Sequence, residues 1–308
     1  MVPPEQGINM LPRTRILLST IALLPLAVSS AGAQTPPPPR PDFAAAPGWA
    51  YIAAAKCWAH FPDAQKKLEP MFMGWSGKCT DQKISGTGNL TVATDLIING
   101  QFENGELKTG NVSWFGGMIT YQGSFSDGAL RGTGKIAFAD GSQYQGSIVD
   151  DKFDGQGRWD MSSTVHYEGG FKNNVMYGKG TLTWSQGSIE GEFNGWTAPP
   201  GEVIFTETGK APVSALLTAP AITAAAPVTP PPWPDGFRGS LVAIAHFMVM
   251  PDGSVADVHA YTTLPGKTGV AQTLPVDFAK AVQAARFTPA KIGDTVIALP
   301  WEVAVAYE

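Results

Sequence analysis

Three five-residue stretches, YQGSF at 121–125, YQGSI at 144–148 and YEGGF at 167–171, recur with a period of 23 residues. The same step leads back to INGQF at 98–102 and WSGKC at 75–79, and IEGEF at 189–193 follows after 22 residues. A fixed period of this length is typical of a protein built from stacked copies of one small unit. The framework residues of these copies include Trp75, Gly77, Tyr121, Gly123, Phe125, Tyr144, Gly146, Tyr167, Gly169 and Phe171.

The framework residues share one face of a predicted strand, because positions i, i+2 and i+4 point to the same side. The glycine leaves a gap between two large side chains. We expect apolar side chains of a second strand, such as Leu182 and Trp184, to fill it. The aromatic residues recur in every copy, whereas one ligand would need only a few, so they are interpreted as core. A Gly-x-Gly motif marks the second strand at 86–88, 132–134, 155–157 and 178–180, whereas the copy expected at 109 is blurred, with Thr109 and Asn111 around Gly110.

Dipeptides that favour tight turns separate the predicted strands. Asn104-Gly105, Asp127-Gly128 and Asp140-Gly141 are residue pairs that tolerate the positive φ of a two-residue hairpin turn. No proline occurs between Pro70 and Pro199, as expected for paired strands. Each repeat is therefore predicted to be a β-hairpin, and the stack an elongated, twisted sheet.

The pattern Tyr-x-Gly-x-Phe followed by Gly-x-Gly resembles the MORN repeat family over about residues 75–195. The resemblance implies a β-hairpin array, here placed at 75–196. It also implies a binding or scaffolding module, sometimes associated with membranes, that is not itself an enzyme.

A second, smaller domain is predicted at 235–308, after an Ala- and Pro-rich linker at 197–234 that should be extended and semi-rigid. The apolar positions 278, 281, 282 and 285 have helical spacing, and Asp277 is a suitable N-cap. The predicted elements are strands at 240–250 and 254–261, a helix at 277–286, and a last strand pair at 295–299 and 301–307.

This order, strand, strand, helix, strand, strand, is similar to the TonB C-terminal domain. The motifs that carry the resemblance are Asp252-Gly253 in the first hairpin and Arg286-Phe287 with Pro289 after the helix. The resemblance implies a periplasmic domain that pairs a sheet edge with a peptide of an outer-membrane transporter. The linker is too short to cross a periplasm at about 3.1 Å per residue, which argues against energy transduction.

The beginning of the chain has the pattern of a signal peptide. Arg13 and Arg15 precede an apolar run at 16–28, and Ala31 and Ala33 have the spacing of a cleavage site. We expect cleavage after Ala33, export to the periplasm, and a Pro-rich lead-in at 34–74. An uncleaved inner-membrane anchor is the alternative, and Met10 is an alternative start.

Cys57 and Cys79 are the only cysteines. An even pair in an exported protein predicts a disulfide that ties the lead-in to the first repeat. A metal site is the alternative, but neither CxxC spacing nor a nearby histidine pair supports it.

Composition and motifs argue against several function classes. The formal net charge is −5 and no basic run occurs, so nucleic acid is an unfavourable ligand. The Gly-x-Gly motifs lack the third glycine of a dinucleotide fingerprint, and no P-loop or nucleophile elbow occurs. His246 and His259, which are predicted to face each other across a hairpin, are considered as a metal pair and as ordinary strand residues.

The sequence therefore predicts a mainly β, non-enzymatic protein with no catalytic, cofactor or metal site. The leading hypothesis is a periplasmic adaptor or scaffold that binds envelope or outer-membrane proteins, with membrane association possible. The alternatives are a TonB-type transducer component, which requires an uncleaved N-terminal anchor, and an enzyme assembled from isolated polar residues.

Overall fold

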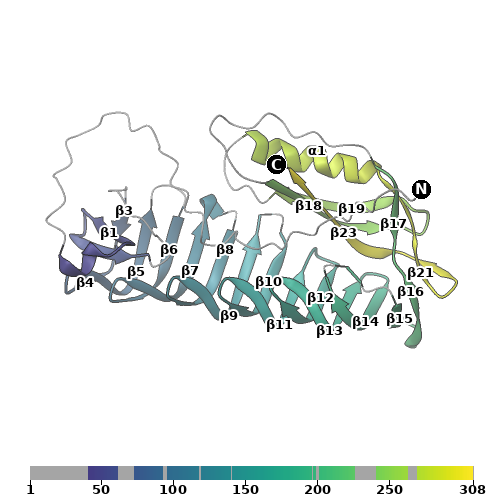
Figure 1. Cartoon of the computed structure of the whole chain (residues 1–308), viewed down its shortest axis with the longest axis horizontal. Coiled ribbons are helices and arrows are strands. Elements are labelled where there is room, and N and C mark those ends of the chain that lie inside the picture. Colours follow the sequence, from purple (N-terminus) through teal and green to yellow (C-terminus); the bar gives the residue numbers. More distant parts are fainter. Residues whose placement is uncertain are drawn as a thin grey trace, which may run out of the picture. The chain divides into compact units, whose positions relative to one another are not determined.

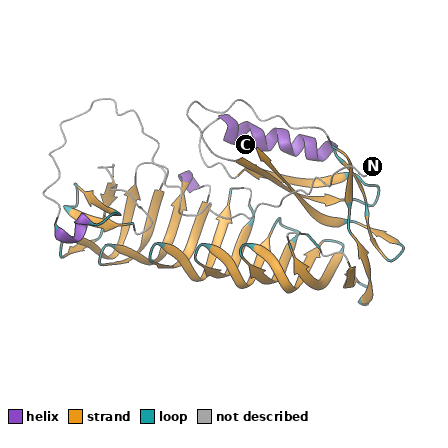
Figure 2. Ribbon diagram, viewed as in Figure 1, coloured by secondary structure: helices purple, strands orange, loops and turns teal. Residues whose placement is uncertain are grey.

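The computed structural model describes residues 41–61, 73–92, 96–117, 119–139, 141–195, 197–198, 201–225, 241–262 and 269–307. The described residues are mainly β-strand, as predicted (Figure 2). They fall into two compact units, an N-terminal unit of 41–139 with 145–152 and a C-terminal unit of 141–144 with 153–307. The predicted signal peptide, 1–33, lies outside the described residues, and no helix among these is long and apolar enough to cross a membrane.

The N-terminal unit contains η1 (Asp42–Ala45), β1 (Trp49–Ile52), β2 (Cys57–His60), β3 (Met73–Trp75), β4 (Lys78–Thr80), β5 (Lys83–Val92), β6 (Leu96–Glu103), β7 (Glu106–Trp114), η2 (Phe115–Gly117), β8 (Ile119–Ser126) and β9 (Ala129–Phe138). β1 pairs antiparallel with β2, and β2 pairs parallel with β5. From β5 to β9 each strand pairs antiparallel with the next, as the predicted hairpins require (Figure 1).

The first repeat departs from the predicted single strand at 75–79. Trp75 ends β3 opposite Leu90, whereas Cys79 lies in β4 opposite Ile84. The two pairings differ in register by two residues, and Ser76 and Gly77 between the strands absorb this offset. The strand is broken because both halves pair with the same long strand, β5, at different registers.

The C-terminal unit holds most of the later strands, and β10 (Gln143–Val149) has residues in both units. The further strands of the array are β11 (Lys152–Asp160), β12 (His166–Lys172), β13 (Val175–Trp184), β14 (Gly187–Asn194), β15 (Gly201–Glu207) and β16 (Val213–Thr218). From β11 to β16 each strand pairs antiparallel with the next.

The first part of the predicted linker at 197–234 forms strands instead of an extended spacer. β15, β16 and β17 (Ala221–Ala224) lie within it, and Val203, Phe205 and Leu217 are buried. Residues 203 and 205 alternate with exposed positions, so β15 continues the sheet in spite of the Ala- and Pro-rich composition nearby. Residues 226–234 lie outside the described part of the chain.

The C-terminal domain contains β18 (Leu241–Val249), β19 (Val255–Thr262), α1 (Gly269–Ala284), β20 (Arg286–Thr288), β21 (Ala290–Ile292), β22 (Thr295–Ile297) and β23 (Leu299–Tyr307). β18 is the central strand of a three-stranded sheet and pairs with both β19 and β23. Phe278 and Val282 of α1 belong to the core that includes Phe247 and Val249.

Two predictions for this domain were wrong. The helix begins at Gly269, eight residues before Asp277, so Asp277 lies inside the helix and is not its N-cap, and Pro275 lies within the helix without ending it. The last two strands do not pair with each other. Gly293, at φ 56°, is followed by β22, which turns back onto β21, while β23 pairs with β18.

Short strands connect this domain to the end of the array. β21 pairs with β16, through Leu217 opposite Ile292, and β20 pairs with β17, through Ala221 opposite Thr288. The predicted domain boundary at 235 therefore separates β17 from β20, which are hydrogen-bonded partners.

Candidate binding surfaces

On the inner face of the array, tyrosine rings pack over glycines. Tyr121, Tyr144 and Tyr167 are at most 1% exposed. The ring of Tyr167 occupies the space that a Cβ on Gly169 or Gly180 would need. The repeat's own aromatic residue thus fills the gap, and not the apolar residues of the second strand as we had expected.

The same arrangement recurs along the chain. Tyr121 lies over Gly134 as well as Gly123, and Trp75 lies over Gly88 as well as Gly77. The second glycine belongs to the Gly-x-Gly motif of the neighbouring strand. One bulky ring therefore requires two glycines, one on each strand. This explains why the two sequence landmarks repeat together.

The polar ends of the Tyr121, Tyr167 and Trp75 rings have defined partners. Tyr121 Oη donates to Ser124 O at 2.9 Å, Tyr167 Oη to Gly170 O at 3.0 Å, and Trp75 Nε1 to Lys78 O at 3.0 Å. In each case the acceptor is three residues further on. Burial raises the pKa of Tyr121 and of Tyr167 to about 12. Tyr121 and Tyr167 are core residues and cannot contact a ligand without unfolding of the repeat, whereas Trp75 is partly exposed.

The hairpin turns follow the same period. Positive φ occurs in pairs at 81–82, 104–105, 127–128, 150–151 and 173–174, of which only the two Gly-containing pairs were predicted. The second turn residue bonds to the residue 21 positions earlier: Asn174 N donates to Phe153 O at 3.0 Å, and Asn174 Oδ1 accepts from Phe153 N at 2.7 Å. Asp151 makes the same pair of bonds with Leu130.

The lead-in is held to the array by a covalent bond and a polar chain. The predicted disulfide between Cys57 and Cys79 is confirmed, with their Cα atoms 6.0 Å apart. His60 stacks on Trp49, and its Nδ1 lies 2.8 Å from Glu106 Oε1. Burial acts to raise the pKa of Glu106, but hydrogen bonds from Lys108 and His60 lower it below its ordinary value. This contact could not be predicted from the sequence because 46 residues separate its partners.

The centre of the outer face of β5 to β8 carries no charge, whereas Glu103, Glu106 and Lys108 lie toward the turn between β6 and β7. We call the outward side chains of residues 87–91, 97–101, 109–113 and 120–124 the amide face. Its central row runs across the strands through Asn89, Asn99, Asn111 and Gln122, which are register partners. The flanking rows carry Ser, Thr and Gln, with Ile97 as the one apolar residue.

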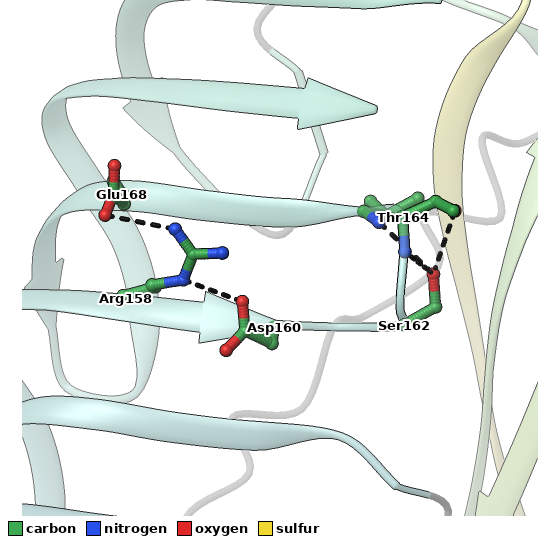
Figure 3. A network of polar contacts seen from close by, with 6 residues as sticks. Arg158, Asp160, Ser162, Thr164 and Glu168 are labelled. Atoms are coloured by element: carbon green, nitrogen blue, oxygen red, sulfur yellow. Dashed lines mark hydrogen bonds and ion pairs between the residues drawn. The ribbon is translucent and has the colours of Figure 1, made fainter. Parts of the chain in front are cut away.

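The outer face of β11 to β14 is different. We call the outward side chains of residues 154–160, 166–172, 177–183 and 188–192 the charged face. Arg158 lies between Asp160, at 2.8 Å on its own strand, and Glu168, at 3.2 Å on the next strand (Figure 3). Partial burial acts to lower the pKa of Arg158, but these hydrogen bonds raise it overall.

The structure brings together the two motifs of the C-terminal domain. Phe287 N donates to Gly253 O at 2.9 Å, and the Phe287 ring packs on Phe247 with centroids 5.4 Å apart. Gly253 has φ 77°. The hydrogen bond from Ser254 lowers the pKa of Asp252, and Arg286 Nη1 bonds to Ala285 O at the helix end. Pro289 separates β20 from β21. These residues hold the first hairpin against the segment after the helix.

The two strand histidines are register partners, as predicted, but each contacts a carboxylate. His246 Nδ1 lies 3.0 Å from Glu302 Oε2 in a buried pair, and His259 Nε2 lies 3.0 Å from Asp257 Oδ1 at the surface. Within the described residues, no group of three or more His, Cys, Asp or Glu side chains is placed to hold a metal ion.

The repeat geometry agrees with comparison to known families. The MORN repeat family matches residues 121–143, 144–162 and 167–189. Residues 121–189 are MORN repeats. The matched MORN repeats cover β8 to β13 and the first part of β14, and include Tyr121, Tyr144 and Tyr167. No curated protein matches the chain.

Proposed function

We propose that the protein is a non-catalytic, exported adaptor that binds a protein partner through the edge of its C-terminal sheet. The observation that carries this proposal is β23. It pairs with β18 over nine residues, and no strand of the described residues pairs with its other edge. A long strand edge is a template for pairing with an extended segment of another chain.

Three further features support the proposal. Gly253 and Phe287, which belong to the two motifs that resemble the TonB C-terminal domain, are joined by a backbone hydrogen bond. The Cys57–Cys79 disulfide suits an oxidising compartment such as the periplasm. The array core is filled by its own aromatic residues, so its role is to present surfaces, which is the behaviour of a scaffold.

The experiment places a photo-crosslinking amino acid in the full-length chain, because a fragment starting at 235 would lack β17, the partner of β20. Val305 of β23 is 39% exposed and is the test position. Ile204 on the outer face of β15, 42% exposed, is the matched control. We expect one defined protein crosslinked through Val305, by an extended segment, and none through Ile204. Partners captured only from array positions would refute the edge-pairing proposal.

A further inference from the structure

The amide face is a regular grid of neutral hydrogen-bonding groups. Three cross-strand rows of four positions each run over β5 to β8. Eleven of these twelve positions are Ser, Thr, Asn or Gln, and Ile97, at 40% exposed, is the exception. The grid ends at β9, where Lys135 stands opposite Gln122 and Arg131 opposite Ser124.

Most side chains of the grid are exposed, and some of them are already ordered by hydrogen bonds to each other. Asn99, Gln101, Asn111 and Gln122 are all exposed. Asn89 Nδ2 donates to Asn99 Oδ1 at 2.6 Å, and Thr87 Oγ1 donates to Gln101 Oε1 at 2.8 Å. Each amide still has donor and acceptor capacity that points to solvent, since an amide has two donors and two acceptor sites. Side chains ordered before binding lose less entropy on binding.

The chemistry of the grid selects against most ligand classes. An anionic ligand, such as a phosphate group or nucleic acid, is bound through Lys or Arg, and the grid holds neither. A membrane or an apolar peptide face needs a contiguous apolar area, and Ile97 alone does not supply one. A β-strand peptide pairs with a sheet edge and not with a face. The amide and hydroxyl groups of the grid instead match an uncharged ligand that both donates and accepts hydrogen bonds repeatedly.

We propose that the amide face binds a neutral polysaccharide chain. Sugar hydroxyls each donate and accept, so they match amide and hydroxyl side chains without any ion pair. Neighbouring strands lie about 4.8 Å apart and residues i and i+4 about 14 Å apart, so the grid is roughly 14 Å in each direction. That footprint accommodates several sugar rings. This activity goes beyond the proposed protein-binding role and does not depend on β23.

The test is affinity electrophoresis of the full-length protein in native gels that contain neutral polysaccharides. The probes are dextran, galactomannan, xylan and hydroxyethyl cellulose, with dextran sulfate as the anionic comparison. We expect at least one neutral polymer to retard the protein, with a dissociation constant unchanged between low and high NaCl, because no charge contributes. The double variant N99A/N111A should bind about tenfold more weakly, since it removes two sets of hydrogen bonds.

The matched control is T181A/E190A, which changes register partners on the outer face of β13 and β14. It should bind like the wild type. Unchanged circular dichroism and an unchanged unfolding midpoint show that N99A/N111A is folded. Failure of all four neutral polymers to retard the protein would overturn the proposal. Stronger binding to dextran sulfate than to the neutral polymers, or an equal loss of polysaccharide affinity in the two double variants, would also overturn it. The same holds if sedimentation shows a face-to-face dimer that N99A/N111A abolishes and no polysaccharide binds.

Discussion

The N-terminal and C-terminal units have the same inner face but different outer faces. Tyr121 and Tyr167 each lie over two glycines and bond to the carbonyl three residues on. On the outside, β5 to β8 present the neutral amide face, whereas β11 to β14 carry Arg158, Glu168 and other charges. The inner face is restricted by packing, and the outer face is free to vary with what it binds. The two units should therefore bind different ligands, whereas the same packing of aromatic rings over glycines stabilises both.

The largest expected effect tests the shared inner face. Gly134→Val and Gly180→Val place side chains where the rings of Tyr121 and Tyr167 lie, so each should destabilise the protein by about 3 kcal/mol. Chemical denaturation of the full chain measures the loss. The controls Thr133→Val and Lys179→Val, one residue away on the outer face, should have effects below about 0.5 kcal/mol. Similar losses in variants and controls would refute the assignment of the ring to the glycine gap.

High pH should affect both units in the same way. The pKa of Tyr121 and Tyr167 is about 12 in the folded protein and 10.0 ordinarily. The neutral form is thus favoured by folding, so the contribution of each tyrosine to stability is fully present below pH 10 and is lost as the pH rises toward 12, by on the order of 2 kcal/mol per tyrosine. Unfolding followed against pH, with tyrosinate absorbance, measures this. The double variant Y121F/Y167F should lose less stability over that range, and an identical pH profile would count against the assignment.

A smaller effect concerns the turns. Asn174→Gly keeps a residue that tolerates φ 72° but removes the acceptor for Phe153 N, and should cost about 1–2 kcal/mol. Asp151→Gly should cost a similar amount through Leu130 N. Asn174→Asp retains the acceptor and is the control. If Asn174→Gly matches the wild type in thermal unfolding, the side-chain bond does not stabilise the contact between repeats.

The smallest expected effect separates the outer faces. Arg158→Ala removes half-exposed ion pairs and should lower stability by less than about 1 kcal/mol, with the difference shrinking in high salt. Thr87→Ala on the amide face removes a neutral bond to Gln101, so its small cost should not depend on salt. Denaturation at two NaCl concentrations distinguishes them. A salt-dependent cost for Thr87→Ala would contradict the neutrality of the amide face.

Several features of the fold were predictable because they depend on local chemistry. The 23-residue period, the Gly-containing turns at 104–105 and 127–128, and the disulfide follow from residue types at fixed spacings. The turns at 150–151 and 173–174 were missed because Asp-Asp and Asn-Asn are weaker turn signals than Asn-Gly. Their place in the period was the signal that could have found them.

Other features were hidden because their partners are distant in sequence. The split of the first repeat depends on two registers along β5, and the strands at 201–224 depend on pairing with β14 and β20. The contact of His60 with Glu106 and the amide face also arise only when strands are placed side by side. A polar residue in one strand carries little information until its cross-strand neighbours are known.

The period of the chain was sufficient to establish a stack of hairpins with an aromatic and glycine core, because alternation along a strand and turn chemistry act over a few residues. The tertiary structure decided that each tyrosine ring fills the gap over two glycines and that the end of the array pairs with β21. It also decided which polar side chains share one surface. These outcomes depend on packing and register between segments far apart in the chain, where the energy of a contact belongs to the pair and not to either residue.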